Sequence, residues 1–322
     1  MNILFTSAGR RVALIRSFQT ELRKIDVKAK IFAVDANPEY SAACHIADKS
    51  FGINRLSHPN YIDDLLFICK QNDVGLLIPT IDTELILLAN NLKLFTDENI
   101  QIVVSDIGLI NKCRDKRLTH ELLTSKNIDV ATLYEKSNPV FPMFIKPYDG
   151  SCSNDTYKIT TREMLTEYHF SNDKLLFLEY VDHDEHTEFT IDLYYDKLSN
   201  LKCIVPRERI EVRSGEVNKG ITRKNFLVDF IKARLLNIEG ARGCITLQVF
   251  VNNSNNRVIG IEINPRFGGG YPLSYLSGAN FSKWIIDEYL FNKKIDVFND
   301  WEDNLLMLRY DDEILVHDFK AK

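Results

Sequence analysis

Three polar side chains near the C-terminal third could together hold a divalent cation. Residues 243–264 consist of two apolar, β-rich runs separated by an Asn- and Ser-rich turn, which is typical of a β-hairpin. The first run carries Gln248, and the second carries Glu262 and Asn264. Alternate residues of a strand share a face, so Glu262 and Asn264 point the same way and the paired strand can bring Gln248 to them. A carboxylate and two amides supply only oxygen donors, which suits Mg²⁺.

The residues that follow this hairpin indicate anionic ligand chemistry. Pro265 and Arg266 end the strand, and a run of three glycines begins at Gly268. A planar guanidinium beside an open glycine run can bind carboxylate or phosphate groups. An ordinary hairpin with a polar outer face is the competing interpretation of the hairpin taken alone.

Two lysines stand where they could hold phosphates. Lys116 follows Asp115 at the expected start of a helix. Lys146 ends a strand that runs into a loop of small residues, among them Gly150, Ser151 and Ser153. A lysine acts as a point charge on phosphates, and backbone N–H groups of such a loop can cap phosphate oxygens. A plain surface loop is the alternative.

A third group of residues could bind a purine nucleoside. The apolar run 175–181 ends in Glu179, Tyr180 and Val181, and a strand end of this kind offers an apolar slot and backbone hydrogen bonds. Glu188 follows a polar turn, and Glu185 in that turn is its rival as a ribose ligand. His183 and His186 stand in the same turn among acids, where a solvated turn is a better interpretation than a metal site.

A charged ribbon covers residues 206–220. If it is a strand, Arg207, Arg209 and Arg213 alternate onto one face, and such a row is costly unless it meets anions. Lys219 follows in the same ribbon. An exposed, solvated ribbon remains the simpler alternative.

Composition argues against nucleic-acid and membrane partners. The 322 residues carry a formal net charge of −5, whereas phosphate backbones require clustered basic residues. No apolar run approaches the ~18 residues of a membrane span. The first residues form an expected strand and turn, not a signal peptide. Six scattered cysteines lack metal-like spacing and are typical of a reducing compartment, so we expect a cytoplasmic protein.

The elements that position the N-terminal residues alternate in type. Strands are expected at 2–6, 31–35, 49–53, 74–79 and 100–104, with helices between them. This alternation predicts an α/β domain with a doubly wound parallel sheet, in which ligands bind beyond the carboxyl ends of the strands. The candidates there are Ser7 to Arg11, Asp35, Asn37 and Thr80 to Glu84, although turn polarity explains each one singly. A nicotinamide-binding domain is disfavoured because the three-glycine spacing is missing.

Taken together, these motifs resemble the ATP-grasp superfamily, and within it the large chain of carbamoyl phosphate synthetase. That pattern places a Glu fourteen residues after a Gln and then Asn-Pro-Arg, as at Gln248, Glu262 and Asn264 to Arg266. The resemblance implies a doubly wound pre-ATP-grasp domain at 1–105 and an α+β, two-lobed ATP-grasp domain at 106–322. The small nucleotide lobe would cover about 120–180 and the C-terminal lobe about 181–322. Cys152 and Asp155 depart from the family's loop, where glycines are expected.

The resemblance also implies a role for each candidate residue. Mg²⁺, with Mn²⁺ as a substitute, would be held by Gln248, Glu262 and Asn264. ATP would contact Lys116, Lys146, Gly150, Ser151, Ser153, Glu179, Tyr180, Val181 and Glu188. Arg266, Arg209 and Lys219 would serve catalysis, and Arg207 and Arg213 would bind the substrate.

The activity implied is that of a ligase for small molecules. ATP would convert a carboxylate into an acyl phosphate, which an amine or similar nucleophile then attacks. Two alternatives stay open: phosphorylation of bicarbonate, as in carbamoyl phosphate synthesis, and a nucleotide-binding module without catalysis. A homodimer is compatible with this class.

Overall fold

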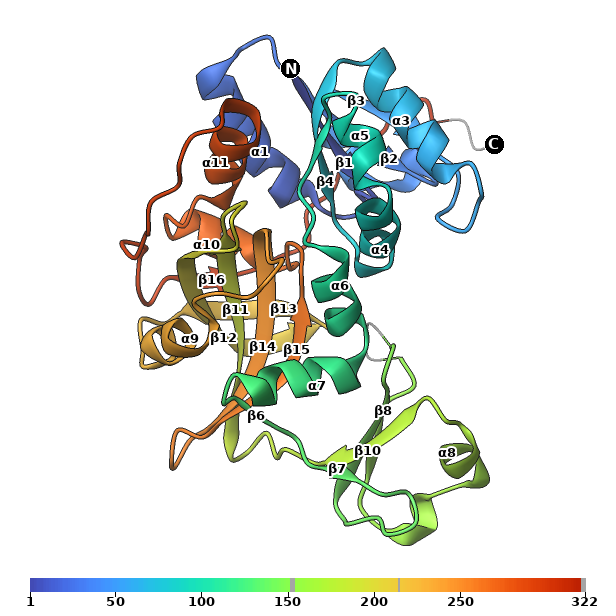
Figure 1. The fold of residues 1–322 in the computed structure, drawn as a ribbon, viewed down its shortest axis with the longest axis vertical. Coiled ribbons are helices and arrows are strands. Elements are labelled where there is room, and N and C mark those ends of the chain that lie inside the picture. The colour runs from blue at the N-terminus through green and yellow to red at the C-terminus, as the bar shows by residue number, and fades with distance from the viewer. Residues whose placement is uncertain (151–153, 214, 320–322) are drawn as a thin grey trace. The chain divides into compact units, whose positions relative to one another are not determined.

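The computed structural model describes residues 1–150, 154–213 and 215–319, and they form two compact units (Figure 1). The first unit comprises Met1–Val104, Asn280–Ile295 and Met307–Lys322. The second comprises Ser105–Ala279 and Asp296–Leu306. The chain therefore returns to its first unit near the C-terminus, although the sequence placed everything after residue 105 in one domain.

The first unit is built around a five-stranded parallel sheet in the order β3-β2-β1-β4-β5, as predicted. The interiors of its central strands are apolar because helices cover both faces of such sheets. Helix α1 packs with a buried stripe that includes Leu14, Phe18 and Leu22. The elements are β1 (Asn2–Thr6), α1 (Val12–Ile25), β2 (Ile31–Asp35), η1 (Pro38–Tyr40), α2 (Ala42–Ile46), β3 (Lys49–Gly52), α3 (Tyr61–Gln71), β4 (Val74–Pro79), α4 (Asp82–Asn90), α5 (Leu92–Thr96) and β5 (Gln101–Ile102).

The second unit begins with two helices and a small sheet. Helices α6 (Ile107–Arg114) and α7 (Lys116–Ser125) pack against each other. The four-stranded sheet has the order β7-β10-β8-β9. Met143, Ile145 and Phe177 form its core, so Lys146 on β8 projects to the opposite side. The elements are β6 (Asp129–Val130), β7 (Leu133–Tyr134), β8 (Met143–Pro147), β9 (Tyr157–Ile159), η2 (Arg162–Met164), α8 (Glu167–Ser171) and β10 (Leu175–Glu179).

A seven-stranded sheet in the order β16-β13-β12-β11-β14-β15-β6 forms the larger part of the second unit. Neighbouring strands from β13 to β15 are antiparallel, which explains their alternating pattern of buried and polar residues. The elements are β11 (His186–Tyr195), β12 (Leu201–Arg213), β13 (Glu216–Thr222), α9 (Leu227–Leu235), β14 (Gly243–Asn252), β15 (Val258–Asn264) and α10 (Tyr271–Leu276).

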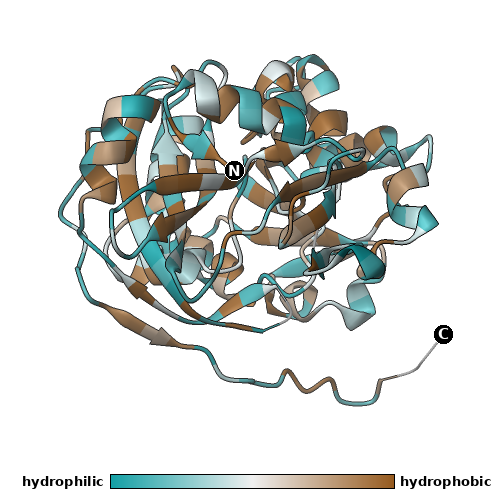
Figure 2. Cartoon of the chain, turned by 90° about the horizontal axis from the view of Figure 1, so that it is seen from below, coloured by the Kyte–Doolittle hydropathy of each residue, from teal (hydrophilic) through white to brown (hydrophobic). Residues whose placement is uncertain are grey.

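The two faces of this sheet differ in chemistry. One face buries Ile191, Leu247 and Ile263 in a core to which α6, α7 and α9 contribute. The alternate residues of the same strands therefore face the other way, and these include the polar groups of the predicted site. Hydrophobic residues are prominent in the strands, whereas the helices carry both hydrophobic and hydrophilic residues (Figure 2).

The C-terminal segment contains α11 (Phe281–Ile285), the π-helical turn η3 (Ile286–Leu290) and β16 (Leu306–Leu308). Strand β16 pairs within the large sheet, and residues 313–316 form no strand. The expected fold class, a doubly wound parallel domain followed by lobes built on antiparallel sheets, is confirmed.

Candidate active site

The three predicted metal ligands lie together on the polar face of the large sheet. Gln248 on β14 stands directly opposite Glu262 on β15, and Thr246 stands opposite Asn264. The Asn264 amide Nδ2 donates to Glu262 Oε1 at 2.8 Å. All three ligand candidates are half-buried, so each is accessible from one side only.

This donor set fits a hard divalent cation. It offers oxygen atoms from one carboxylate and two amides, with no sulfur or imidazole. Among the described residues, no group of three or more His, Cys, Asp or Glu side chains could hold a metal by itself. Glu262, Gln248 and Asn264 would therefore hold Mg²⁺ only together with other oxygen ligands, such as phosphates or water.

The two predicted phosphate-binding lysines belong to the same electrostatic cluster as Glu262. Lys116 Nζ donates to the Gly150 carbonyl at 2.6 Å. Burial, and then the positive charge of Lys116, lower the pKa of Lys146 to about 8, whereas Glu262 opposes this shift. Lys116, Lys146 and Glu262 come from α7, β8 and β15, so the fold brings three separate segments to one place.

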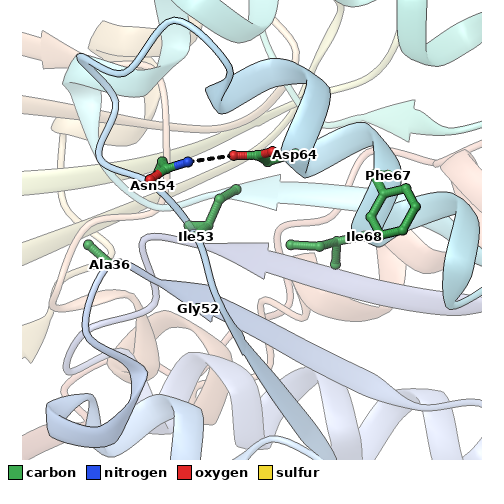
Figure 3. A pocket seen from close by; sticks show the side chains of 7 residues that line it. All are labelled: Ala36, Gly52, Ile53, Asn54, Asp64, Phe67 and Ile68. Carbon is green, nitrogen blue, oxygen red and sulfur yellow. Dashed lines mark hydrogen bonds between the residues drawn. The ribbon is translucent and has the colours of Figure 1, made fainter. Parts of the chain in front are cut away.

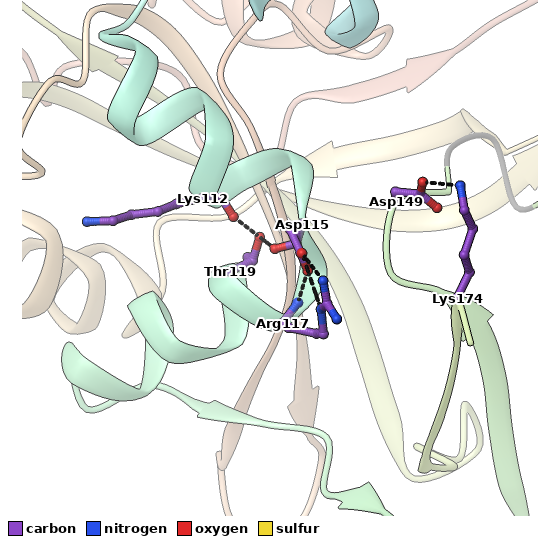
Figure 4. Close-up of polar contacts among 6 residues, drawn as sticks. All are labelled: Lys112, Asp115, Arg117, Thr119, Asp149 and Lys174. Atoms are coloured by element: carbon purple, nitrogen blue, oxygen red, sulfur yellow. Dashed lines mark hydrogen bonds and ion pairs between the residues drawn. The ribbon is translucent and has the colours of Figure 1, made fainter. Parts of the chain in front are cut away.

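Hydrogen bonds fix the entrance of the loop that follows β8 (Figure 4). Asp115 caps α7 by accepting from the Arg117 backbone N–H at 2.9 Å and forms an ion pair with the Arg117 guanidinium. The guanidinium of Arg117 lies 3.8 Å from the centre of the Tyr148 ring. Asp149 pairs with Lys174 at 2.7 Å. These contacts hold the start of α7 against the end of β8.

The loop itself is only partly described. Gly150 lies at its start, but Ser151, Cys152 and Ser153 lie outside the described residues. Asp155, at the far end, has φ of 56°, a left-handed conformation that Asp tolerates better than most residues. Its carboxylate accepts from Tyr157 at 2.6 Å and from Tyr168 at 2.7 Å. Asp155 can therefore take the place of a glycine here while tying the loop end to its neighbours.

The predicted nucleoside ligands fall into two sets. Glu179 Oε2 accepts from the Thr132 hydroxyl at 2.8 Å, so its side chain is engaged within the protein. Tyr180 and Val181 are half-buried, and Lys158 Nζ lies 4.0 Å from the centre of the Tyr180 ring. If the 179–181 segment binds a purine base as predicted, Glu179 would therefore contact the base through its backbone and not through its carboxylate.

Glu188 and Glu185, the two candidate ribose ligands, differ in burial. Glu188 is half-buried on β11, and burial raises the pKa of its carboxyl, with Glu262 raising it further and Arg209 lowering it. Glu185 is exposed in the turn before β11. His186 Nδ1 contacts the Asp182 carbonyl at 2.9 Å, which agrees with the interpretation of this segment as a solvated turn.

The expected row of three arginines on one face is interrupted. Arg207 is buried, with only 1% of its surface exposed, and forms a bidentate ion pair with Asp192 at 2.8 and 2.9 Å. Arg209 is half-buried and pairs with Glu188 at 3.3 Å. Arg213 is exposed. The pairing of β12 with β13 shifts register after Arg209, and such bulges break the regular alternation on which the row depended.

Lys219 lies on β13 beside the same bulges. Its Nζ pairs with Glu211, and both side chains remain partly exposed. Arg266, by contrast, is half-buried at the end of β15 and donates from Nη1 to the Phe267 carbonyl at 3.0 Å. Arg266 therefore follows the strand that carries Glu262 and Asn264, whereas Lys219 lies on a different strand.

The glycine run after Arg266 packs so closely against the sheet that a side chain at Gly269 or Gly270 would not fit. A Cβ on Gly270 would lie 2.3 Å from Nη1 of Arg207, and one on Gly269 would lie 2.8 Å from the Glu216 carboxyl. Ser274 on α10 donates to Asp192 at 2.6 Å. The glycine run and α10 are thus held close to the buried Asp192–Arg207 pair.

Sequence reasoning missed two groups in this unit. Asp192 is fully buried and binds Arg207, but a single acid in an apolar strand gave no signal of its partner. His120 lies on α7 four residues after Lys116, and burial, Lys146 and Lys116 lower its pKa to about 4. The spacing of four from Lys116 could have indicated a shared helix face.

The first unit contains its own polar cluster at the carboxyl ends of its strands. Glu84 is fully buried and accepts from the hydroxyls of Thr6 (2.8 Å), Ser7 (3.1 Å) and Tyr61 (2.5 Å). Asp35 accepts from the Gly9 backbone N–H at 3.0 Å. The side chains of Ser7, Asp35 and Glu84 therefore all form hydrogen bonds within the protein.

A pocket of about 450 Å³ also lies in the first unit (Figure 3). Asn54 donates to Asp64 across it at 2.7 Å, while Phe67 and Ile68 line its apolar part. The remaining lining residues are Ala36, Gly52 and Ile53. None of the predicted site residues lines this pocket.

Two family models match the chain. Residues 3–103 match the PylC-like N-terminal domain, and residues 171–307 match the ATP-grasp domain described as belonging to a biosynthetic pathway with the Ter operon. No curated protein sequence matches the chain at a significant level. Among the described residues, no helix is long and apolar enough to cross a membrane.

Solved structures share the fold at low sequence identity. N5-carboxyaminoimidazole synthetase of Staphylococcus aureus with ADP has a TM-score of 0.70 and 16% identity over 95% of this chain and 79% of its own. The biotin carboxylase domain of Hydrogenobacter thermophilus 2-oxoglutarate carboxylase, solved with MgADP and bicarbonate, has a TM-score of 0.71 and 13% identity over 94% and 73%. L-amino acid ligase of Bacillus licheniformis has a TM-score of 0.67 and 13% identity over 90% and 74%.

Longer enzymes match as well. The chain covers 27% of Rhizobium etli pyruvate carboxylase, which aligns over 87% of this chain with a TM-score of 0.66 and 13% identity. The family models thus describe residues 3–103 as a PylC-like N-terminal domain and residues 171–307 as an ATP-grasp domain, and the solved structures share the fold. Two of these neighbours were solved with ADP, and one of the two also contains its magnesium salt.

Proposed function

We propose that this protein activates a small-molecule carboxylate with ATP and joins it to an amine or a similar nucleophile. One observation carries this proposal: Gln248, Glu262 and Asn264 form a single row of oxygen donors, and Glu262 acts electrostatically on Lys146. Cation ligands and phosphate-binding lysines thus meet in one unit. This is the arrangement that phosphoryl transfer needs, since the protein contributes mainly positioning and charge.

Each group of residues has a distinct task in this mechanism. Bound Mg²⁺ would neutralise phosphate charge. Lys116 and Lys146 bind and orient the phosphates, and Arg266 stabilises charge that develops on the transferred group. Glu188 and the 179–181 segment position the nucleoside.

The acid substrate then needs cations of its own. Arg209 lies between the Glu188 carboxylate and the Thr190 hydroxyl, so it can orient a carboxylate beside the phosphates. Lys219 and Arg213 remain candidates further along the ribbon, whereas Arg207 is so deeply buried that we assign it an indirect role. A carboxylate attacks the terminal phosphorus of ATP, ADP leaves, and the nucleophile displaces phosphate from the acyl phosphate.

The alternative acid is bicarbonate. The fold is shared with a biotin carboxylase domain solved with bicarbonate, which favours keeping this second candidate. The same metal-ligand row would serve both reactions, so the two candidates differ in the acid and in the nucleophile.

The test is a screen for ADP release. Purified protein with ATP and Mg²⁺ is given panels of carboxylic acids, each with and without a panel of amines, and ADP is measured by an enzyme-coupled assay. We expect release that requires both an acid and an amine. Release that requires only bicarbonate and ammonia would replace this proposal with the carbamoyl alternative. Tight nucleotide binding without turnover across the panels would instead indicate a non-catalytic module.

A further inference from the structure

His120 is a titratable group of the nucleotide site that the mechanism above does not use. It lies on α7 four residues after Lys116, so the two side chains emerge one above the other on the same helix face. Its imidazole is half-buried. Among the described residues, neither ring nitrogen hydrogen-bonds to protein.

Two lysines define the electrostatic setting of this imidazole. Burial is the largest cause that lowers the pKa of His120 to about 4, and the charges of Lys146 and Lys116 add to it. Lys116 is itself fixed, because its Nζ donates to the Gly150 carbonyl at 2.6 Å. His120 is therefore neutral in the free protein at ordinary pH, with its ring beside two cations.

The elements packed against α7 carry other charged groups. Helix α6 carries Lys112 and Arg114, β15 carries Glu262, and β6 carries Asp129. The charges of Lys146 and Lys116 lower the pKa of His120 in addition to burial, which is the larger cause. A ligand that changes the charge around those two lysines therefore also changes the pKa of the imidazole.

We propose that His120 is a third phosphate-binding group of the nucleotide site and takes up a proton from solvent when the polyphosphate binds. Phosphate oxygens at Lys116 and Lys146 replace a net positive surrounding with a negative one. The protonated ring then donates a charge-assisted hydrogen bond to a phosphate oxygen. This inference rests on the proposed nucleotide site and extends it to a residue that no motif includes.

A histidine suits this position better than a third lysine would. Like charges in a half-buried site repel one another more strongly than in water. Lys146 already responds to Lys116, since that charge helps to lower its pKa. A histidine is neutral in the free protein, so it does not repel Lys116 and Lys146 there. When it is protonated in the presence of nucleotide, it adds a positive charge that binds phosphate.

Proton uptake is the measurement that tests this. Titration calorimetry of the full chain with Mg·ADP at pH 6.0, in buffers of different ionisation enthalpy, gives the number of protons taken up on binding. If binding returns the pKa of His120 to the ordinary 6.5, the affinity of the wild type should weaken about tenfold between pH 5.5 and 7.5. Lys146, whose pKa is about 8, takes up its proton in a separate, higher range.

Variants then assign the proton to a residue. His120→Gln should lose most of the uptake at pH 6.0 and its share of the pH dependence, while His317→Gln, an exposed histidine, should keep both. The nucleotide's own protonation is common to all variants and cancels in the comparison. Thermal melting checks that each variant folds, and His120→Asn serves as a second substitution.

The outcomes are distinct. Wild-type uptake that persists unchanged in His120→Gln, or an absence of uptake in a wild type that binds Mg·ADP, would overturn the inference and leave a neutral, space-filling histidine. A wild type that binds no Mg·ADP at any pH would instead overturn the proposed function itself.

Discussion

Glu262 on β15 stands directly across from Gln248 on β14, and its carboxylate acts on the ammonium group of Lys146. The strand register therefore places one carboxylate where it can serve a cation and a phosphate-binding lysine together. Because Asn264 already donates to Glu262 at 2.8 Å, this carboxylate is held in place before any ligand arrives.

Glu262→Gln should remove the magnesium dependence of nucleotide binding. The amide keeps the shape of the side chain but loses the single negative charge of the row, so Mg²⁺ should no longer be held. We expect Mg²⁺ to improve the affinity of the wild type for ADP. In the presence of Mg²⁺, the variant should bind ADP about tenfold or more weakly than the wild type does. Calorimetry with and without Mg²⁺ measures this. Glu239→Gln, on an exposed glutamate, is the control, and equal Mg²⁺ dependence in both variants would remove Glu262 from the site.

Lys146→Met should make the free protein more stable while weakening its hold on nucleotide. The native pKa of Lys146, about 8, lies below its ordinary 10.5, so keeping the charge costs free energy whenever the pH is below 8. A shift of this size corresponds to about 3 kcal/mol. The cost shrinks as the pH rises from 8 to 10.5, so the advantage of the variant should shrink with it.

Urea unfolding at pH 7 and pH 10 measures this effect of Lys146. Lys112→Met, on an exposed lysine, is the matched control. A variant no more stable than the wild type at pH 7 would mean that the charge of Lys146 is not costly in the free protein.

Arg207→Met should destabilise the second unit strongly. Among the described residues, the Ser274 hydroxyl, at 2.6 Å, would then be the remaining side-chain hydrogen-bond partner of the buried Asp192. Removing one member of a buried ion pair costs about 3–5 kcal/mol. Arg257→Met removes a comparable contact at the surface, 2.7 Å from Asp129, and should cost at most about 1 kcal/mol.

A double variant separates charge from packing at this pair. Arg207→Met with Asp192→Asn should recover part of the loss in urea unfolding, because no unpaired charge remains. A double variant less stable than Arg207→Met alone would contradict this account.

Gly270→Ala should destabilise the protein, whereas Gly108→Ala should stabilise it. At Gly270 the new methyl would lie 2.3 Å from Nη1 of Arg207, whose bidentate contact with Asp192 prevents it from moving away. Overpacking of this kind costs about 1–3 kcal/mol. At Gly108, in α6, nothing lies within 4 Å, and alanine is favoured over glycine in helices by about 0.5–1 kcal/mol. Thermal melting of both variants gives the comparison, and the same sign of change in both would refute it.

Much of this protein could be predicted from local patterns. Alternation in residues 243–264 gave the hairpin, the shared face of Glu262 and Asn264, and the partner strand of Gln248. The parallel sheet of the first unit followed from alternating strands and helices. These features repeat within a few residues, so their physical cause is visible in a short stretch of sequence.

Other features depended on partners far away in the chain. The arginines of β12 looked equivalent by spacing, but bulges after Arg209 and the carboxylate of Asp192 gave each one a different environment. The return of residues 280–295 to the first unit was also invisible, because their apolar pattern does not say which core they join.

The sequence by itself determined the fold class and the row of oxygen donors, since strand periodicity and the spacing of Gln248, Glu262 and Asn264 are local properties. Only the tertiary structure decided that Arg207 is buried and that His120 lies under the influence of Lys146. Burial and electrostatic coupling depend on distances between segments remote in sequence, and those distances are fixed only when the chain packs.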